Sequence, residues 1–303
     1  MNKFSIVVCA YNAASRLQTT LNHLAKLEYP KDHLEIIIID NNSTDGTADL
    51  AYKLWEYFNS PFELYVTTER QQGLTYARKL GISSAKYDLI IFCDDDNWLS
   101  SDYLLVADET IKNHPKIGVL GGQGIPVTDE PGFPNWFYTY ASGYATGVQA
   151  LDTGDVSARG YVWGAAAIVK KNLLLAAISS GLDFLLTDRK GETLTSGGDS
   201  EICKWYLICG YKLWYDKRLI FKHYIPQQRL SEDYLTKLYK GFSTASTVLA
   251  EYDRWILLSG ERSRGWTMPI RRLNAELRNM RNRSDLRRTV GSIARSLKLL
   301  AFT

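Results

Sequence analysis

Long apolar runs and a strong net charge are both missing from this sequence. No run approaches the roughly 18 to 20 apolar residues that cross a bilayer, so any membrane contact is expected to be peripheral. The formal net charge is only +3 over 303 residues, which gives no overall electrostatic case for a nucleic-acid partner. The strand-like stretch Phe4 to Ala10 is followed by Tyr11 and Asn12 rather than by a small-residue cleavage site, so no secretory signal is expected.

Cysteine is scarce, and its spacing follows no known pattern. The chain has neither a CxxC pair nor a histidine partner pattern among its four cysteines, Cys9, Cys93, Cys203 and Cys209. Two of them fall in apolar stretches typical of buried strands. They indicate reduced thiols of the core rather than disulfides or a zinc site, which favours a cytoplasmic location.

A glycine-rich dinucleotide signature is also absent. The first apolar stretch is followed by AYNAASRL, which lacks the GxGxxG spacing that lets a backbone approach a pyrophosphate. The glycine cluster Gly121 to Gly124 follows the strand-like stretch Ile117 to Leu120 without the full spacing, so we expect a bend there. Any phosphate site must be built in another way.

The pattern that is present alternates strands and helices. Hydrophobic residues make up 45% of the chain, enough for one large domain with an appendage or for two domains. Apolar stretches typical of buried strands are Phe4–Ala10, Leu34–Ile39, Phe62–Thr67 and Leu89–Cys93. The stretches between them are predicted to be helical: Ala13–Leu27, Thr47–Phe58 and Gly73–Ala85. This order predicts an α/β fold with a Rossmann-like, mostly parallel sheet flanked by helices.

Three carboxylates end the last of these strands. The stretch YDLIIFCDDDNW runs from Tyr87 to Trp98, and Asp94, Asp95 and Asp96 leave the strand together. Adjacent negative charges repel one another unless solvent, a cation or a counter-charge compensates them. Oxygen ligands at a strand's carboxyl end suit Mg²⁺ or Mn²⁺, with substrate phosphates as further ligands. A solvated acidic turn is the simpler alternative.

Five motifs occur along the chain in a fixed order. They are SIVVCAYN, IIIIDNNSTDGT, ERQQGLTYARKLGISSAKYDLIIFCDDD, GGDSEI and FKHYIPQQRL. Through them, most of the first 225 residues resemble the family 2 glycosyltransferases of the GT-A fold. The resemblance implies transfer of a sugar from a nucleotide-sugar donor, with a UDP-sugar favoured. The acceptor would be a hydroxyl of a glycan or lipid-linked glycan in polysaccharide biosynthesis.

For the acidic strand end, the resemblance implies a divalent cation, Mn²⁺ or Mg²⁺, on the donor's phosphates. Asp96 would be the direct metal ligand, and Asp94 would lie near the nucleotide ribose. Asp95 fills the middle position, and its acidity leaves open which carboxylate binds the metal. His223 matches a histidine that completes the metal site in some relatives, and a purely structural histidine is an equal alternative.

The turns after the first two strands correspond to the positions that cradle the nucleotide base in the family. They contain Ala10, Tyr11 and Asn12 after the first strand and Asp40 after the second. A carboxylate can accept a hydrogen bond from a base N–H and a tyrosine can flank the ring, although Asp and Asn favour turns in any protein. Arg78 could face the diphosphate, or it could be an exposed helical arginine.

Asp199 lies where the family places its catalytic base. A single base opposite a leaving group implies direct displacement with inversion at the anomeric carbon. The family pattern is Glu-Asp, whereas Gly198 precedes Asp199 here, so the second carboxylate is missing and Glu201 becomes the fallback candidate. The position of Asp199 also fits a plain helix cap.

Aromatic residues are expected around the acceptor. By resemblance, Trp163 belongs to a segment that lines the donor and acceptor pocket; aromatic faces suit sugar rings, but core packing explains this residue equally well. The aromatic-rich segment Phe133 to Tyr144 has no helical or strand period and is expected to be a loop. It would be either a lid that excludes water or a plain surface loop.

The pattern changes after Pro226, which divides the chain into a catalytic domain, residues 1–225, and a helical, basic extension, residues 226–303. The first half of the catalytic domain would bind the donor, and the second half would hold the acceptor and the base. Residues 230–258 have a helical pattern, and from Arg262 onward basic residues are set among leucines and isoleucines. Such a basic amphipathic segment could lie peripherally on the cytoplasmic face of a membrane. Packing on the catalytic domain, or on a second subunit in a homodimer, is the alternative.

Two other functions share parts of this pattern. A sugar-phosphate nucleotidylyltransferase has the same layout but should begin with a glycine-rich signature and a lysine, both of which are missing here. A catalytically silent nucleotide-sugar or glycan-binding protein would keep the fold, but the intact Asp94, Asp96 and Asp199 favour an enzyme. We therefore predict a metal-dependent glycosyltransferase.

Overall fold

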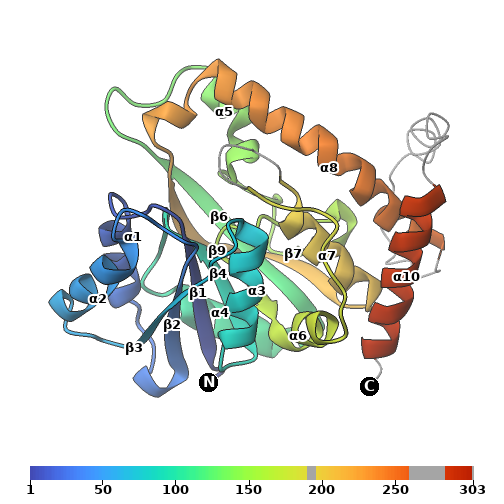
Figure 1. Cartoon of the computed structure of the whole chain (residues 1–303), viewed down its shortest axis with the longest axis horizontal. Helices are drawn as coiled ribbons and strands as arrows, with labels where there is room; N and C mark the ends of the chain where they lie inside the picture. The colour runs from blue at the N-terminus through green and yellow to red at the C-terminus, as the bar shows by residue number, and fades with distance from the viewer. Residues whose placement is uncertain (190–195, 259–283, 302–303) are drawn as a thin grey trace.

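The apolar stretches of the sequence become neighbouring strands at the centre of the molecule (Figure 1). The computed structural model describes residues 1–189, 196–258 and 284–301. Within these ranges nine strands form one sheet in the order β3-β2-β1-β4-β8-β6-β9-β5, with β7 paired to β9. Their bounds are β1 Phe4–Ala10, β2 Leu34–Asp40, β3 Glu63–Thr68, β4 Leu89–Asp94, β5 Asn97–Leu99, β6 Ile117–Val127, β7 Gly154–Asp155, β8 Ala167–Lys170 and β9 Lys212–Tyr224.

Helices cover both faces of the sheet. The α-helices are α1 Leu17–Ala25, α2 Thr47–Tyr57, α3 Leu74–Ser84, α4 Tyr103–Asn113, α5 Phe137–Tyr140, α6 Lys171–Ser179, α7 Gly198–Ile208, α8 Glu232–Leu258 and α10 Ser284–Ala301. Short 3-10 turns are η1 Lys31–His33, η2 Ala141–Tyr144, η3 Ser157–Arg159 and η4 Gln227–Arg229. The predicted strands and helices are all present, and their ends differ from the predicted bounds by a few residues.

The predicted α/β fold class is confirmed. β1 to β4 pair in parallel, as do β6 and β9, whereas β5, β7 and β8 run antiparallel to their neighbours. In parallel strands all carboxyl ends lie at the same edge of the sheet. The register therefore places Ala10 beside Asp40, and Cys9 beside Asp94.

The central strands are buried on both faces. In β1, Ile6 and Val8 pack in the layer that contains α1, α2 and α4, whereas Val7 packs in the layer that contains α3, α6 and α7. The same alternation holds in β2 and β4. Because neither face meets water, these strands are apolar at nearly every position.

The glycine cluster Gly121 to Gly124 is not the predicted bend. It lies inside β6, where the pairing with β9 shifts register between Gly121 and Gln123. A Cβ at Gly122 would lie 2.1 Å from the carbonyl oxygen of Leu219. The glycine therefore allows two backbones to approach closely at an irregularity of the ladder.

The C-terminal extension packs on the rest of the chain. α8 runs along the upper side of the molecule in Figure 1 and contacts α7, and α10 contacts α6, α7 and α8. α10 buries its apolar face in the same layer as α3, α6 and α7, through Val290, Ile293, Ala294 and Leu297. Of the alternatives predicted for the basic extension, the structure shows α10 packed on α6 and α7, which belong to the part of the chain before residue 226. The basic residues from Arg262 to 283 lie outside the described residues.

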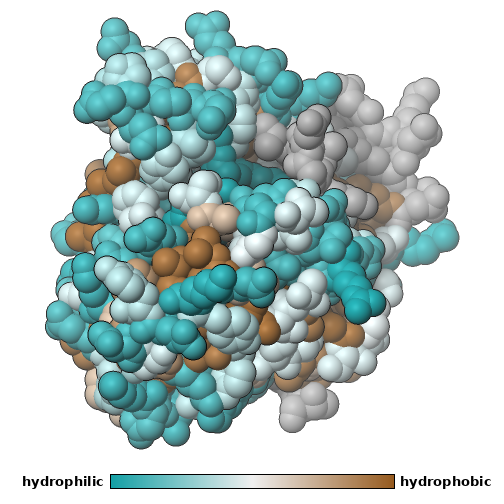
Figure 2. All heavy atoms as spheres, turned by 60° about the vertical axis from the view of Figure 1, so that its left-hand side comes forward, coloured by the Kyte–Doolittle hydropathy of each residue, from teal (hydrophilic) through white to brown (hydrophobic). Residues whose placement is uncertain are grey.

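The face drawn in Figure 2 is largely hydrophilic. Figure 2 shows hydrophobic atoms gathered near the middle of one face, with hydrophilic side chains around them. Within the ranges given above, no helix combines the length and the apolar character needed to cross a membrane. The apolar stretches of the sequence lie in the two buried layers.

Candidate active site

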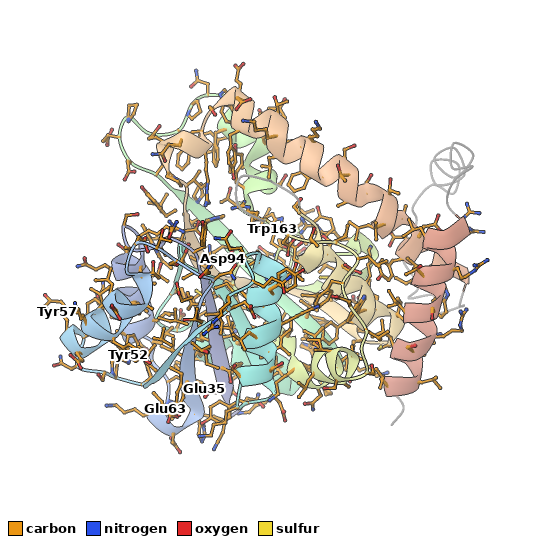
Figure 3. The ribbon with its side chains drawn as sticks, in the orientation of Figure 1. Glu35, Tyr52, Tyr57, Glu63, Asp94 and Trp163 are labelled. Carbon is orange, nitrogen blue, oxygen red and sulfur yellow. The ribbon has the colours of Figure 1, made fainter. Side chains whose placement is uncertain are left out.

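A cavity of about 670 Å³ opens at the carboxyl ends of β1 and β4. Strand ends, the η2 turn, the start of α7 and one side of α8 form its walls. In Figure 3, Asp94 and Trp163 lie near this end of the strands, whereas Glu35 and Glu63 lie at the opposite end. The carboxyl edge is where open α/β sheets bind ligands, so this cavity is the candidate site.

An arginine holds the middle aspartate of the strand end. Arg16 Nε and Nη2 each donate to one carboxylate oxygen of Asp95 at 2.7 Å, and the same guanidinium donates to the backbone oxygens of Tyr11 and Asn12. Burial raises the pKa of Asp95 to about 6, although the hydrogen bonds from Arg16 act in the opposite direction. The bidentate pair occupies both oxygens of Asp95, and Asp96 accepts from Arg229 Nη1 and Asn97 Nδ2, so of the three aspartates Asp94 is the most accessible to a metal ion.

Asp96 is surrounded by potential cations. Arg229 Nη1 donates to one of its oxygens at 2.9 Å, and His223 Nε2 lies 3.5 Å from the other. Burial by itself raises the pKa of Asp96, but His223 and Arg229 outweigh burial and hold that pKa well below its usual range. His223 Nδ1 lies 2.7 Å from the carbonyl oxygen of Tyr144. A carbonyl only accepts, so Nδ1 carries the hydrogen of this contact.

Asp94 lacks the counter-ion that its two neighbours have. Its side chain lines the cavity and, in the part of the chain that the structure describes, takes part in no hydrogen bond or ion pair. Burial, followed by the nearby charge of Asp96, raises the pKa of Asp94. Across the described ranges, no three His, Cys, Asp or Glu side chains are grouped so as to hold a metal ion by themselves. A cation here would need phosphate or water ligands in addition to Asp94, Asp96 and His223.

Asp199 lines the same cavity from the first turn of α7. Its two oxygens accept hydrogen bonds from the Gly164 N–H at 2.9 Å and the Ser200 N–H at 2.7 Å. A Cβ at Gly164 would lie 2.8 Å from the Asp199 Cβ, so glycine permits this contact. Gly197 occupies the N-cap position of α7, and the alternative of Asp199 as a plain cap is therefore wrong.

A carboxylate from another segment lies next to Gly198. Asp188 Oδ1 accepts from the Gly198 N–H at 2.8 Å, and Asp188 Oδ2 accepts from Arg78 Nη1 at 2.5 Å. The Arg78 and Asp188 side chains are only 8% and 7% exposed. Arg78 therefore lines the cavity as a paired residue, and the alternative of an exposed helical arginine is wrong.

Glu201 is not on the cavity wall. Its side chain is fully buried and accepts hydrogen bonds from the backbone N–H groups of Leu185 and Leu186 and from the Tyr252 hydroxyl, at 2.6 to 3.0 Å. Burial raises the pKa of Glu201 to about 7. The prediction that Glu201 serves as the fallback base or a pocket residue is wrong, because the helix turns this side chain towards α8 and the core.

The predicted base-binding residues divide into two pairs. Ala10 and Tyr11 line the cavity, and Asn12 and Asp40 do not. The Asn12 side-chain oxygen accepts from the Thr44 N–H at 2.9 Å, and Asp40 is only 5% exposed at the end of β2. In this structure Asn12 and Asp40 have the contacts of turn residues, which was the alternative stated for them.

Several cavity residues were missed by sequence reasoning. The motifs contain Asn41, Gln72 and Arg229 without indicating how their side chains point, and all three line the cavity. Asn41 accepts from the Gly73 N–H at 2.7 Å and so ties two turns together. Arg16 and Asp188 lie outside the five motifs. The three adjacent aspartates indicate that basic partners are needed, but the sequence does not show that Arg16 is one of them.

Aromatic residues line the side of the cavity below α8. Trp163 is only 6% exposed and also lies on the cavity wall, so its position fits both core packing and a pocket role. The predicted loop Phe133 to Tyr144 contains α5 and η2, and its Ser142, Gly143 and Tyr144 reach the cavity. One side of α8 supplies six further lining residues: Tyr234, Leu238, Tyr239, Phe242, Ala245 and Leu249.

A family model matches the segment that contains the acidic strand end. The family model described as glycosyl transferase family 2 matches residues 5–153. Over these residues the chain belongs to that family. Poly-beta-1,6-N-acetyl-D-glucosamine synthases of Staphylococcus aureus (strain COL) and Staphylococcus epidermidis are each 33% identical to it over 118 residues. Each match covers 39% of this chain and 27% of the relative, so the chain spans about a quarter of the length of these relatives.

Solved structures resemble this chain over nearly its whole length. S. aureus TarS 1-349 in complex with UDP-GlcNAc has a TM-score of 0.57 at 17% identity, covering 98% of this chain and 90% of that one. The mannosyltransferase PcManGT from Pyrobaculum calidifontis, in complex with GDP-Man and Mn²⁺, has a TM-score of 0.55 at 18% identity, covering 99% and 86%. At such identities the likeness establishes the fold, which is of the GT-A type.

Proposed function

We propose that this chain is a metal-dependent, inverting glycosyltransferase. It would move a sugar from a nucleotide-sugar donor, with a UDP-sugar favoured, to a hydroxyl of a glycan or lipid-linked glycan. The observation that carries the proposal is that Asp94 and Asp96 at the end of β4 and Asp199 at the start of α7 line one cavity. The strand end suits a phosphate-bound cation, and Asp199 suits a base.

The charge balance of the cavity favours a cation. Its described lining contains five carboxylates, from Asp94, Asp95, Asp96, Asp188 and Asp199, and four guanidinium groups, from Arg16, Arg78, Arg189 and Arg229. Three of these arginines are already paired with aspartates. A diphosphate would add negative charge to a wall that is already acidic, which is unfavourable without a compensating ion.

The residues present fit such an ion. Asp94 offers unpaired oxygens, Asp96 has one oxygen turned to His223, and the Tyr144 carbonyl fixes the His223 ring. Carboxylate and imidazole ligands suit Mn²⁺, and carboxylates suit Mg²⁺. When bound, the cation would act as a Lewis acid on the phosphate oxygens of the leaving group.

Asp199 would carry out the proton transfer. Its carboxylate takes the proton of the acceptor hydroxyl as the hydroxyl oxygen bonds to the anomeric carbon. The bond from that carbon to the phosphate oxygen breaks, and its electron pair leaves with the nucleoside diphosphate. The Gly164 and Ser200 N–H groups hold the carboxylate in place. Attack opposite the leaving group inverts the anomeric centre.

The assignment of substrates rests on similarity. The TarS and PcManGT complexes contain UDP-GlcNAc and GDP-Man, which supports a nucleotide-sugar donor, and the synthase relatives support a glycan product. The division into a catalytic domain, residues 1–225, and an extension, residues 226–303, is part of the proposal. α8 lines the cavity, so the extension would help to bind the acceptor.

A donor screen tests the function. Melting temperatures of the purified chain are measured with UDP-, GDP- and dTDP-sugars, with and without Mn²⁺, and released nucleoside diphosphate is assayed in parallel. We expect one nucleotide class to raise the melting temperature only with the metal. Equal shifts without metal would contradict the site. Asp199→Asn should keep the shift and lose turnover, whereas a silent binding protein would show the shift without turnover in the wild type.

A further inference from the structure

Packing, rather than backbone conformation, requires glycine at position 198. Gly197 has a φ of 115°, but Gly198 is not among the residues with positive φ. A Cβ at position 198 would lie 2.4 Å from Asp188 Oδ2 and 3.0 Å from Asp188 Oδ1. The carboxylate of Asp188 therefore occupies the volume that a side chain at 198 would fill.

The same carboxylate joins two walls of the cavity. Its Oδ1 accepts from the Gly198 N–H at the start of α7, and its Oδ2 accepts from Arg78 on α3. Arg78 Nη2 lies 3.1 Å from where a Cβ of Gly164 would be, and Gly164 donates to Asp199. The contacts thus run from Asp188 to Asp199 by both the α7 backbone and the Arg78 side chain.

We infer that Asp188 is a positioning residue for the transfer proposed above, on which this inference rests. It fixes the first turn of α7 so that Asp199, the next residue along from Gly198, keeps its carboxylate on Gly164 and towards the cavity. It also orients Arg78 and compensates the charge of that guanidinium. Since both Asp188 oxygens are engaged by Gly198 and Arg78, Asp188 acts through these neighbours rather than on the substrate.

The geometry provides a test by relocation of the carboxylate. An aspartate oxygen lies two bonds from its own Cβ, about the distance that separates a Cβ at 198 from Asp188 Oδ2. An aspartate at 198 could therefore replace the carboxylate once position 188 is glycine. The variants are Asp188→Asn, Gly198→Asp and the double variant Asp188→Gly with Gly198→Asp. The matched control is Asp183→Asn, which changes a 69% exposed acid on the same segment.

We expect Asp188→Asn to lower kcat at least about 30-fold while the donor KM changes less than about threefold, because positioning affects the reacting geometry more than donor binding. Gly198→Asp alone should lose as much, because two carboxylates would share one volume. The double variant should recover to within about fivefold of the wild-type kcat. Asp183→Asn should stay within about twofold of it.

Two results would overturn the inference: Asp188→Asn with more than half of the wild-type kcat, or a folded double variant no more active than Asp188→Asn. If Asp188→Asn does not fold, the double variant decides the matter. A double variant with near-wild-type melting and activity supports the positioning role, and near-wild-type melting without activity contradicts it. Wild-type and Asp183→Asn chains that turn over no donor would instead refute the proposed function, and this inference with it.

Discussion

The acidic residues at the end of β4 and those at the start of α7 have different kinds of partners. At the end of β4, Asp96 meets the side chain of Arg229 and faces His223. At the start of α7, Asp199 and Glu201 are held mainly by backbone N–H groups. The two groups contain the same chemistry, a carboxylate at the end of a regular element, so their differences come from their surroundings.

The pKa values show what the difference in partners does. His223 and Arg229 overcome burial and hold the pKa of Asp96 well below its usual range, whereas burial raises the pKa of Glu201 to about 7 despite three hydrogen bonds. At Asp96 the two basic neighbours outweigh burial, whereas at Glu201 the N–H and hydroxyl donors do not. Asp96 can therefore keep its negative charge, and Glu201 is suited to a structural role.

The largest effect is expected at the strand end. Asp96→Asn should lower turnover by roughly 10³-fold and abolish the Mn²⁺-dependent rise in melting temperature, because it removes a proposed metal ligand and the counter-charge of Arg229. Asp95→Asn is the matched comparison and should cost about tenfold, because Asp95 faces Arg16. Steady-state kinetics and thermal melts with and without Mn²⁺ measure both. Equal losses in the two variants would show that the aspartates are not distinguished by their partners.

The next prediction concerns the ion pair between Arg16 and Asp95 at the strand end. Arg16→Ala leaves Asp95 buried without its bidentate partner, and we expect a loss of about 3 kcal/mol in the free energy of unfolding. The Arg16 and Asp95 side chains are 24% and 9% exposed, so solvent compensates little. Urea unfolding measures the loss. Asp152→Ala, at a pair with 57% and 90% exposure, should cost less than about 0.5 kcal/mol, and a similar cost in both variants would contradict the argument.

Glu201, at the start of α7, should make the free energy of unfolding depend on pH. Its pKa of about 7 in the folded chain lies above the ordinary value of 4.5, so the folded state binds this proton more tightly than the unfolded state. The resulting stabilisation is complete below about pH 4.5 and is lost as the pH rises through about 7. Urea unfolding between pH 4.5 and 7.5 should show a fall in the free energy of unfolding that is about 2 to 3 kcal/mol smaller in Glu201→Gln than in the wild type, because Asp95, whose pKa is also raised, contributes to the fall in both chains.

The pH dependence has its own control. Glu109→Gln, at a side chain that is 56% exposed, should retain the wild-type fall. If Glu201→Gln also retained that fall, another group would be responsible and Glu201 would not be the buried acid that the structure indicates.

The smallest effect is expected at the support of Asp199. Gly164→Ala introduces a Cβ 2.8 Å from the Asp199 Cβ, which should displace the carboxylate by a few tenths of an ångström and lower kcat about tenfold with donor binding unchanged. Gly154→Ala is the control, because a Cβ there meets no atom within 4 Å. Kinetics and a donor titration measure the two variants. An unchanged kcat in Gly164→Ala would mean that Asp199 does not need this contact.

The sequence predicted the fold better than the site. Unbroken apolar stretches such as Leu89 to Cys93 identified strands buried on both faces, and the alternation with helices predicted their parallel order. The positions of Asp94 and Asp96 on the cavity followed from the end of the strand, and that of Asp199 followed from the resemblance to the family. The orientation of Glu201 did not, because a shift of two positions on a helix turns a side chain to a different face.

By itself, the sequence determined which residues stand at the carboxyl ends of strands and at the first turn of α7, because local hydrophobic periods fix where elements begin and end. Only the tertiary structure decided their partners. Arg16 and Asp95 are separated by 79 residues, Arg78 and Asp188 by 110, and Asp96 and Arg229 by 133. Pairings over such separations depend on how helices and strands pack, and no local pattern records them.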